Sequence, residues 1–286
     1  MIPYRIYLSG GGIAAAAHIG ALQELVKHTP ITSVREWMGV SAGSFVAMCL
    51  CIGYTLDEML DFCVRFDFTN IKEVDSIPGW LLHFGMDTGD RLYKMIAACL
   101  HVKGLSSDLS FKELSDLFGY SLRVVATDLN EAAPIVFSTT TTPDYRVADA
   151  VRASMSVPYF FQPFICPESG HLLVDGAVTS NHPLFLLSKE EQARTLSVLI
   201  RISLDKKDTL EIEDYLLRPL NVLYTQKMDI ESTFYDSHCI QIRLDGIDIM
   251  DFSLSEEARQ DIIQKGEDAV QIYLQGQQKP KRRKSF

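Results

Sequence analysis

Short apolar runs alternate with longer stretches of periodic apolar positions along most of the chain. The short runs, rich in β-branched and aromatic residues, predict strands: they are Ile6–Leu8, Trp37–Met38, Leu122–Asp128, Ile135–Ser138, Leu172–Val174, Ser197–Ser203 and Cys239–Leu244. The periodic stretches predict helices: they are Ala14–Lys27, Ser44–Ile52, Asp90–Val102 and Tyr145–Ser154, with a long helical region between the last two strands. Strands and helices that alternate in this way specify a layered α/β domain.

Capping residues mark several helix boundaries. Pairs of the form S/T-x-x-E satisfy free N–H groups at a helix start: they are Thr55 with Glu58, Ser110 with Glu113, and Ser253 with Glu256. Thr29 and Pro30 end the first predicted helix, and Gly53 ends the helix over residues 44–52. These signals predict where the helices begin and end.

The first predicted strand ends in a glycine-rich loop, Ser9–Gly12, that leads into a helix. Glycines allow the backbone of such a loop to approach a ligand closely. One use is dinucleotide binding, but Ala15 replaces the third glycine of the G-x-G-x-x-G pattern, and only Glu36 lies at a suitable distance for a ribose contact. The rival use is an oxyanion hole built from backbone N–H groups. The incomplete fingerprint disfavours dinucleotide binding.

The pentapeptide Gly39–Gly43 has the form G-x-S-x-G, with Ser41 at its centre. It lies between the run Trp37–Met38 and the helical stretch Ser44–Ile52, and a strand–turn–helix context makes this pattern a nucleophile elbow. The Ser41 hydroxyl then stands at a helix N-terminus, where negative charge is stabilised. The alternative is an ordinary turn in which Ser41 is the N-cap.

A serine nucleophile requires a base within hydrogen-bond reach. Ser41, Asp175 and His238 follow the chain order of an α/β-hydrolase triad, but only one strand–helix unit precedes Ser41, whereas that fold builds several strands first. The other candidate is Asp175 acting directly. It follows a predicted strand, and the turn at Gly176 can aim its carboxylate at the elbow. A D-G-A sequence alone is more often only a turn.

The composition is that of a globular protein, with 47% hydrophobic and 22% charged residues. The formal net charge of −10 becomes −15 when the five cations between Lys279 and Lys284 are set aside, and this acidic body argues against nucleic acid as a partner. The six cysteines form no C-x-x-C pair and lie mostly in apolar helical patterns. We therefore expect reduced core cysteines and no metal site.

The longest strongly apolar run, Phe45–Ile52, is far shorter than the roughly 20 residues of a membrane-spanning helix. Met1–Arg5 lead directly into a strand without the features of a secretory signal. We therefore expect a cytoplasmic location. The basic run Lys279–Lys284 is expected to be a disordered, solvated end, with docking on anionic lipid or nuclear import as alternatives.

Several sequence blocks, in order and in spacing, resemble the patatin-like phospholipase family. The blocks are Leu8–Gly12 with His18–Gly20, Gly39–Ser44, Ala126–Asn130, Ala150–Ser154 with Pro158, and Val174–Ala177 with Asn181–Pro183. The resemblance covers roughly residues 5–204. It implies a three-layer α/β/α sandwich around a mostly parallel sheet. We expect one acyl-hydrolase domain over residues 1–275 and a basic tail over residues 276–286.

The resemblance also implies a phospholipase A-type hydrolase with a serine–aspartate dyad, without histidine, metal or cofactor. Ser41 is then the nucleophile that forms an acyl-enzyme and Asp175 the general base, while Gly10, Gly11 and Gly12 supply oxyanion contacts. Unperturbed aspartate, with a pKa near 3.9, is a poor base for a hydroxyl. We expect the helix terminus and the oxyanion donors to assist by stabilising charge as it forms.

One departure from the family pattern lies in the glycine loop. The family usually continues with a basic residue and a glycine, where this chain has Ala14 and Ala15. The missing cation is expected to weaken the oxyanion site or to relax substrate choice, and if Ala15 has to adopt a positive φ, the turn is strained. We therefore expect reduced activity that Ala14→Arg with Ala15→Gly raises. Two other functions stay open: a catalytically silent lipid-binding or regulatory relative, and a soluble carboxylesterase or acyltransferase with the same dyad.

The implied partner is a phospholipid or another acyl lipid, with peripheral membrane contact. The aromatic run Pro158–Phe164 is a candidate lining for the access path, or a core segment. The apolar segment Ile77–Met86 is either a mobile lip over the site or buried packing, and packing is slightly favoured.

Overall fold

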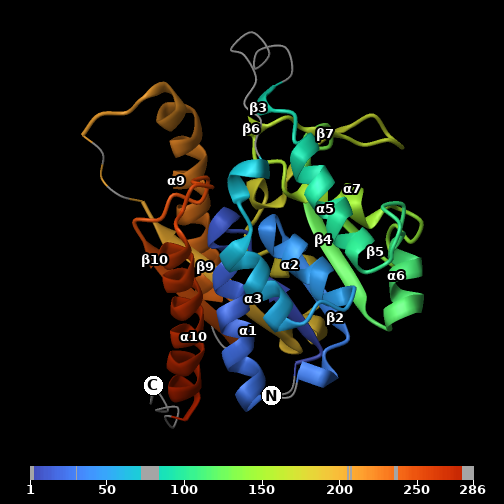
Figure 1. The fold of residues 1–286 in the computed structure, drawn as a ribbon, viewed down its shortest axis with the longest axis vertical. Helices are drawn as coiled ribbons and strands as arrows, with labels where there is room; N and C mark the ends of the chain where they lie inside the picture. Colours follow the sequence, from blue (N-terminus) through green and yellow to red (C-terminus); the bar gives the residue numbers. More distant parts are fainter. Residues whose placement is uncertain are drawn as a thin grey trace.

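A central mixed sheet organises the molecule (Figure 1). The computed structural model describes residues 3–29, 31–71, 84–204, 206, 208–234 and 238–278. Within these residues the sheet has eight strands. They are β1 (Arg5–Leu8), β2 (Glu36–Val40), β4 (Ser121–Asp128), β5 (Ala133–Ser138), β7 (Phe164–Ile165), β8 (Leu172–Asp175), β9 (Thr195–Ser203) and β10 (Cys239–Asp245). Their order is β10-β9-β1-β2-β4-β8-β7, and β5 also pairs with β4.

The register of this sheet brings the two predicted catalytic residues to one edge. The neighbours β10, β9, β1, β2 and β4 are parallel, whereas β8 runs antiparallel to β4. Val40 of β2 pairs with Val125 of β4, and the next residue, Ala126, pairs with Asp175 of β8. Ser41 directly follows Val40. It therefore emerges level with Asp175, with only β4 between their strands.

Helices cover both sides of the sheet (Figure 1). They are α1 (Ala16–His28), α2 (Ala42–Cys51), α3 (Leu56–Arg65), α5 (Asp90–Val102), α6 (Phe111–Phe118), α7 (Val147–Ser154), α8 (Lys189–Ala193), α9 (Ile212–Phe234) and α10 (Glu256–Gln278). Short 3-10 helices join them: η1 (Gly12–Ala15), η2 (Ile31–Ser33), η3 (Phe68–Ile71), η4 (Gly176–Val178) and η5 (Leu184–Leu186). A separate two-stranded sheet pairs β3 (Gly85–Asp87) with β6 (Tyr159–Phe161).

The alternation of side chains along β1 divides the apolar interior into two cores. Ile6 and Leu8 point into the larger core, which also contains the buried faces of α1, α2, α5, α7 and α10. Tyr7 points to the opposite face, where a smaller core includes Ala177 of η4 and is covered by Tyr224 of α9. Successive strand residues face opposite sides of a sheet, so β1 is buried on both faces.

Most predicted elements are confirmed with small shifts at their ends. The capping boxes of Thr55 and Ser110 are present, and Gly53 follows α2 with a φ of 89°. The predicted cap at Ser253 is wrong: Asp251 Oδ1 accepts the Ser253 N–H at 2.9 Å, and Ser255 caps α10 instead. Helix α10 runs through Gln278, past the predicted domain boundary at residue 275. Residues 279–286, the predicted basic tail, lie outside the described residues.

Candidate active site

Ser41 occupies a strained turn between β2 and α2. Its φ of 53° and ψ of −133° fall where a residue with a Cβ rarely lies. The Ser41 N–H donates to Ser154 Oγ at 2.8 Å, and Ser154 Oγ donates to the Val125 carbonyl at 2.6 Å. On the helix side, Ser44 Oγ donates to the Ser41 carbonyl at 2.6 Å. Ser41 is the N-cap residue of α2, as the alternative expects, but its side chain makes no capping hydrogen bond.

Asp175 ends β8 with its carboxylate buried beside Ser41. The residue is 2% exposed, its Oδ1 accepts the Ala177 N–H at 2.8 Å, and its own N–H donates to the Ser156 carbonyl at 2.8 Å. Burial raises the pKa of Asp175 to about 7, against the lowering effect of hydrogen bonds from the Ser41 side chain and the Ala177 N–H. A carboxylate with such a pKa is suited to general-base work near neutral pH. Burial thus supplies the basicity that an ordinary aspartate lacks.

The glycine-rich loop offers fewer free donors than the sequence predicts. Gly10 lies against the nucleophile, since a Cβ added to Gly10 would stand 2.9 Å from Ser41 Cβ. However, the Gly10 N–H donates to Asn181 Oδ1 at 2.7 Å and is not free for an oxyanion. Within the described residues, no acceptor is found for the N–H groups of Gly11 and Gly12. These two remain candidate oxyanion donors.

Ala42 is a third candidate oxyanion donor, which the sequence did not single out. Ala42 is the first residue of α2, and the first N–H groups of a helix have no intrahelical acceptor. In an elbow, the residue after the nucleophile supplies one oxyanion contact. The position of Ala42 directly after Ser41 was therefore the sequence feature that could have identified this candidate donor.

The expected strain at Ala15 is absent. Ala15 has a φ of −59°, and the positive φ belongs to Gly12, at 53°. Ala14 is fully buried, so an arginine there would place a charge in the core without a partner. The surroundings of Ala14 therefore do not support the expectation that Ala14→Arg raises activity.

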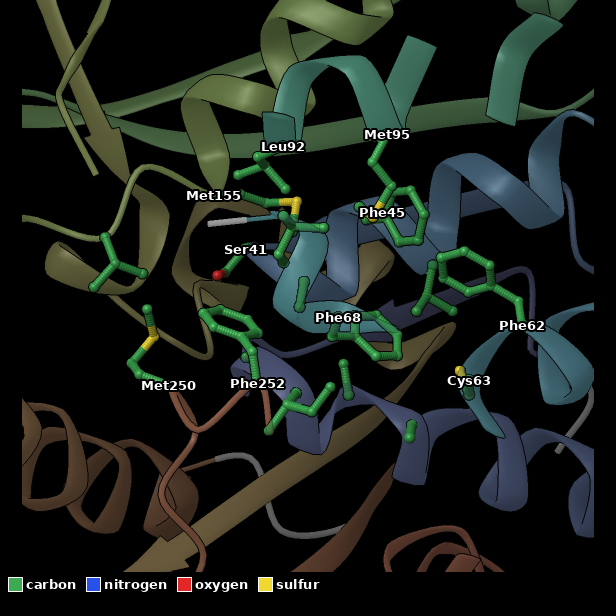
Figure 2. A pocket seen from close by; sticks show the side chains of 18 of the residues that line it. Ser41, Phe45, Phe62, Cys63, Phe68, Leu92, Met95, Met155, Met250 and Phe252 are labelled. Atoms are coloured by element: carbon green, nitrogen blue, oxygen red, sulfur yellow. The ribbon is translucent and has the colours of Figure 1, made fainter. Parts of the chain in front are cut away.

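An apolar pocket opens beside Ser41 (Figure 2). It comprises about 690 Å³ of space, counting the part open to solvent. Figure 2 shows the Ser41 hydroxyl near Phe252 at one end and Phe62 and Cys63 of α3 at the other. Four of the nine methionines line it: they are Met59, Met95, Met155 and Met250. Methionine side chains adapt to irregular apolar shapes, so the pocket suits a flexible hydrocarbon chain.

A segment far along the chain closes one wall of this pocket. Met250 and Phe252, between β10 and α10, both line it. The Ile249 carbonyl accepts the Ile13 N–H at 3.0 Å, which ties this segment to η1. The Phe252 ring lies 5.8 Å from that of Phe160 in β6. The wall thus joins residues that are about 240 positions apart in sequence.

The two alternative chemistries do not fit the geometry. His238 precedes β10, and four strands separate β10 from the Asp175 strand β8. An α/β-hydrolase triad with His238 is therefore not assembled. Glu36, the candidate ribose ligand, is 4% exposed and forms ion pairs with Arg5 and Arg123. It is not available to a dinucleotide.

The remaining predictions have mixed outcomes. Within the aromatic run, Phe161 both lines the pocket and belongs to the buried core, so the two alternatives hold together there, whereas Tyr159 is 49% exposed. All six cysteines are buried and none forms a disulfide, as the sequence indicates. Of the segment Ile77–Met86, residues 77–83 lie outside the described residues. Among the described helices, none combines the length and apolarity needed to cross a bilayer.

Comparison with known sequences identifies related proteins. Residues 6–188 match the model of a family described as patatin-like phospholipase. The uncharacterized protein YqhO of Bacillus subtilis (strain 168) is 29% identical over 293 residues, which cover 93% of this chain and 96% of YqhO. A protein of Invertebrate iridescent virus 6, named "Probable lipid hydrolase 463L", is 25% identical over 186 residues, which cover 64% of this chain and 63% of that protein.

Two solved structures share the fold. VipD from Legionella pneumophila aligns with a TM-score of 0.71 and 16% identity, covering 96% of this chain and 67% of VipD. Full-length ExoU, in complex with SpcU from the type III secretion system of Pseudomonas aeruginosa, aligns with a TM-score of 0.54 and 14% identity, covering 98% of this chain and 54% of ExoU. These likenesses agree with the predicted α/β/α arrangement around a mostly parallel sheet.

Proposed function

Because the chain belongs to the patatin-like phospholipase family, we propose that it hydrolyses fatty-acyl esters of lipids through Ser41 and Asp175. The observation that carries the proposal is the buried Asp175 carboxylate, which has no cation beside it among the described residues and is hydrogen-bonded to the side chain of Ser41, a residue that lines an apolar pocket. Its pKa of about 7 makes it a proton acceptor at neutral pH.

The reaction has two halves. Ser41 Oγ attacks the ester carbonyl carbon while Asp175 takes the hydroxyl proton, and the N–H groups of Gly11, Gly12 and Ala42 stabilise the oxyanion. Collapse of this intermediate breaks the bond to the leaving alcohol, which takes the proton from Asp175. Water then attacks the acyl-enzyme and gives a proton to Asp175. The fatty acid leaves, and the proton returns to Ser41.

The pocket indicates which part of the lipid is recognised. Apart from Ser41, its lining consists of apolar side chains, glycine and Cys63. Such a lining favours a hydrocarbon chain and offers no charged partner to a phosphate. We propose that one acyl chain enters the pocket and that the head group stays outside it. Head-group selectivity is then weak.

A lipid substrate in a bilayer requires contact with the membrane surface. Phe84, which is 66% exposed, directly precedes β3, and Tyr159, which is 49% exposed, is the first residue of β6, whose Phe161 lines the pocket. Exposed aromatic side chains favour the membrane interface. We propose peripheral contact there, by a protein that works in the cytoplasm.

Labelling with an alkyl fluorophosphonate tests the proposal. Attack by Ser41 Oγ forms an O–P bond, fluoride leaves, and Asp175 takes the proton. We expect labelling of the parent and none of Ser41→Ala, with fatty acid released from phospholipid only by the parent. Equal labelling of Ser41→Ala contradicts the assignment. No labelling of the parent, with retained lipid binding, identifies the silent relative instead.

A second pair of substrates separates lipid hydrolysis from soluble esterase activity. We expect turnover of micellar phospholipid to exceed that of short soluble esters, because the apolar pocket contributes binding only to a long chain. Faster turnover of the short esters, or transfer of the acyl group to an alcohol rather than to water, supports the soluble carboxylesterase or acyltransferase alternative.

A further inference from the structure

One amide side chain holds both polar groups of the Gly10 residue beside the nucleophile. The Gly10 N–H donates to Asn181 Oδ1 at 2.7 Å, and Asn181 Nδ2 donates to the Gly10 carbonyl at 3.3 Å. Gly10 itself packs against Ser41, with no room between them for a side chain. The amide therefore fixes the loop at the point where it meets the elbow.

Asn181 is itself anchored from several sides. Its backbone carbonyl accepts a hydrogen bond from the Tyr7 hydroxyl at 2.8 Å. The neighbours on either side are fully buried: Ser180 Oγ donates to Glu231 Oε1 at 2.7 Å, and His182 Nε2 lies 2.9 Å from Ser197 Oγ. These contacts tie the Asn181 backbone to β1 and its two neighbours to α9 and β9. The Asn181 side chain therefore extends from a backbone that is held in place.

The same segment also contains Asp175, the proposed general base. Asn181 comes six residues after Asp175, and η4 lies between them. The Ser180 N–H donates to the Gly176 carbonyl at 3.0 Å, which closes this short turn. A shift of the turn therefore moves Asp175 and Asn181 together. Through Asn181 it also moves the loop of Gly10, Gly11 and Gly12.

We propose that Asn181 is a positioning residue that couples the oxyanion loop to the Asp175 turn. The inference rests on the proposed function, and it assigns the oxyanion contacts to Gly11 and Gly12 because Asn181 occupies the Gly10 N–H. Without the amide, Gly10 is released from the turn and the donors of Gly11 and Gly12 lose their aim. A misplacement of about 1 Å in such a site lowers a rate by about 100-fold.

Asn130 provides a matched control. Its Oδ1 also accepts a backbone N–H, that of Leu172 at 2.8 Å, but on an exposed turn outside the site. The experiment compares the parent, Asn181→Ala and Asn130→Ala in the rate of fluorophosphonate labelling and in the affinity for a fluorescent fatty acid. Labelling depends on oxyanion stabilisation, whereas fatty-acid affinity depends on the apolar pocket.

We expect Asn181→Ala to label about 100-fold more slowly than the parent, with fatty-acid affinity within threefold, while Asn130→Ala labels like the parent. We also expect faster amide hydrogen exchange in the peptide that contains Gly10–Gly12, a readout that does not require activity. Labelling of Asn181→Ala within threefold of the parent, an equal loss in Asn130→Ala, or unchanged exchange overturns the proposal. Labelling of Ser41→Ala at the parent rate defeats the proposed function separately.

If Asn181→Ala does not fold, the variant Tyr7→Phe tests the proposal instead. This change removes only the hydroxyl that holds the Asn181 carbonyl. We expect labelling about three- to tenfold slower at unchanged fatty-acid affinity, since the clamp is loosened rather than removed. Labelling at the parent rate overturns the proposal.

Discussion

The two edges of the central sheet bury charge in opposite ways. At the amino edge, Arg5 and Arg123 meet Glu36 and Glu191: the Arg5 guanidinium lies 2.5 Å from Glu36 and 3.1 Å from Glu191, and Arg123 contacts both carboxylates. At the carboxyl edge, Asp175 is as deeply buried as Arg5 and Glu36, but its side-chain contacts are a hydroxyl and an N–H rather than a cation.

This difference distinguishes a charged cluster that stabilises the fold from a carboxylate that is suited to accept a proton. In a buried ion pair each charge is compensated by its partner, and removing one partner destabilises the fold. A buried carboxylate without a cation has a raised pKa and accepts a proton readily. Burial alone therefore does not mark a catalytic residue in this protein. Among the described residues, Asp175 has no cation at its carboxylate, and this supports the proposed role of Asp175 as the base.

The largest expected effect on activity comes from removing the charge of Asp175. We expect Asp175→Asn to lower the labelling rate and lipid hydrolysis by about 10⁴-fold, because no base then takes the Ser41 proton. Initial rates with a phospholipid substrate check this. Activity within tenfold of the parent contradicts the role of Asp175.

The same change has a pH-dependent effect on stability. The folded pKa of Asp175, about 7, lies above the unfolded value near 3.9, so its favourable contribution is complete below about pH 4 and is lost as the pH rises through 7. Between pH 5 and pH 8 we expect the parent to lose about 3 kcal/mol of unfolding free energy relative to Asp175→Asn. Urea unfolding at both pH values measures it. An equal difference at both contradicts the raised pKa.

At the amino edge we expect the opposite result: a change there lowers stability and leaves the labelling rate unchanged. Glu36→Gln removes the buried one of the two carboxylates that Arg5 and Arg123 share, and we expect the free energy of unfolding to fall by about 3 kcal/mol. Because Glu36 lies at the edge far from Ser41, the folded variant should label at the parent rate. A labelling rate lowered more than fivefold would show that the two edges are not independent.

The local parts of the carboxyl edge were predictable from sequence. The elbow at Ser41 and the turn at Asp175 are set by glycines and by neighbouring strands, which a short window shows. The occupied Gly10 N–H was not predictable, because its acceptor on Asn181 lies 171 residues away. The wall at Met250 is likewise built from a distant segment. Contacts of this kind depend on the register of the sheet rather than on any local pattern.

The cap of the last helix shows a different limit. Ser253 and Glu256 fit the S-x-x-E pattern, but Asp251 takes the Ser253 N–H and hydroxyl at 2.9 and 2.5 Å in a turn of its own. Two local structures competed for the same serine. Sequence alone did not decide between them.

A smaller effect is expected at the far end of the pocket. Cys63→Trp fills the end opposite Ser41, so long acyl chains lose space while short ones keep theirs. We expect kcat/KM for a long-chain ester to fall by about 10–100-fold relative to a short-chain ester. A chain-length series checks this. An equal fall for all lengths would place the acyl chain elsewhere.

The pH dependence of Ser41 labelling tests the central claim most directly. In the parent, the labelling rate should rise with pH and reach half its maximum near pH 7, because Asp175 acts as a base only when ionised. In Asp175→Asn, labelling should be slow and should lack this midpoint. The same midpoint in both proteins would show that another group takes the proton and would contradict the account.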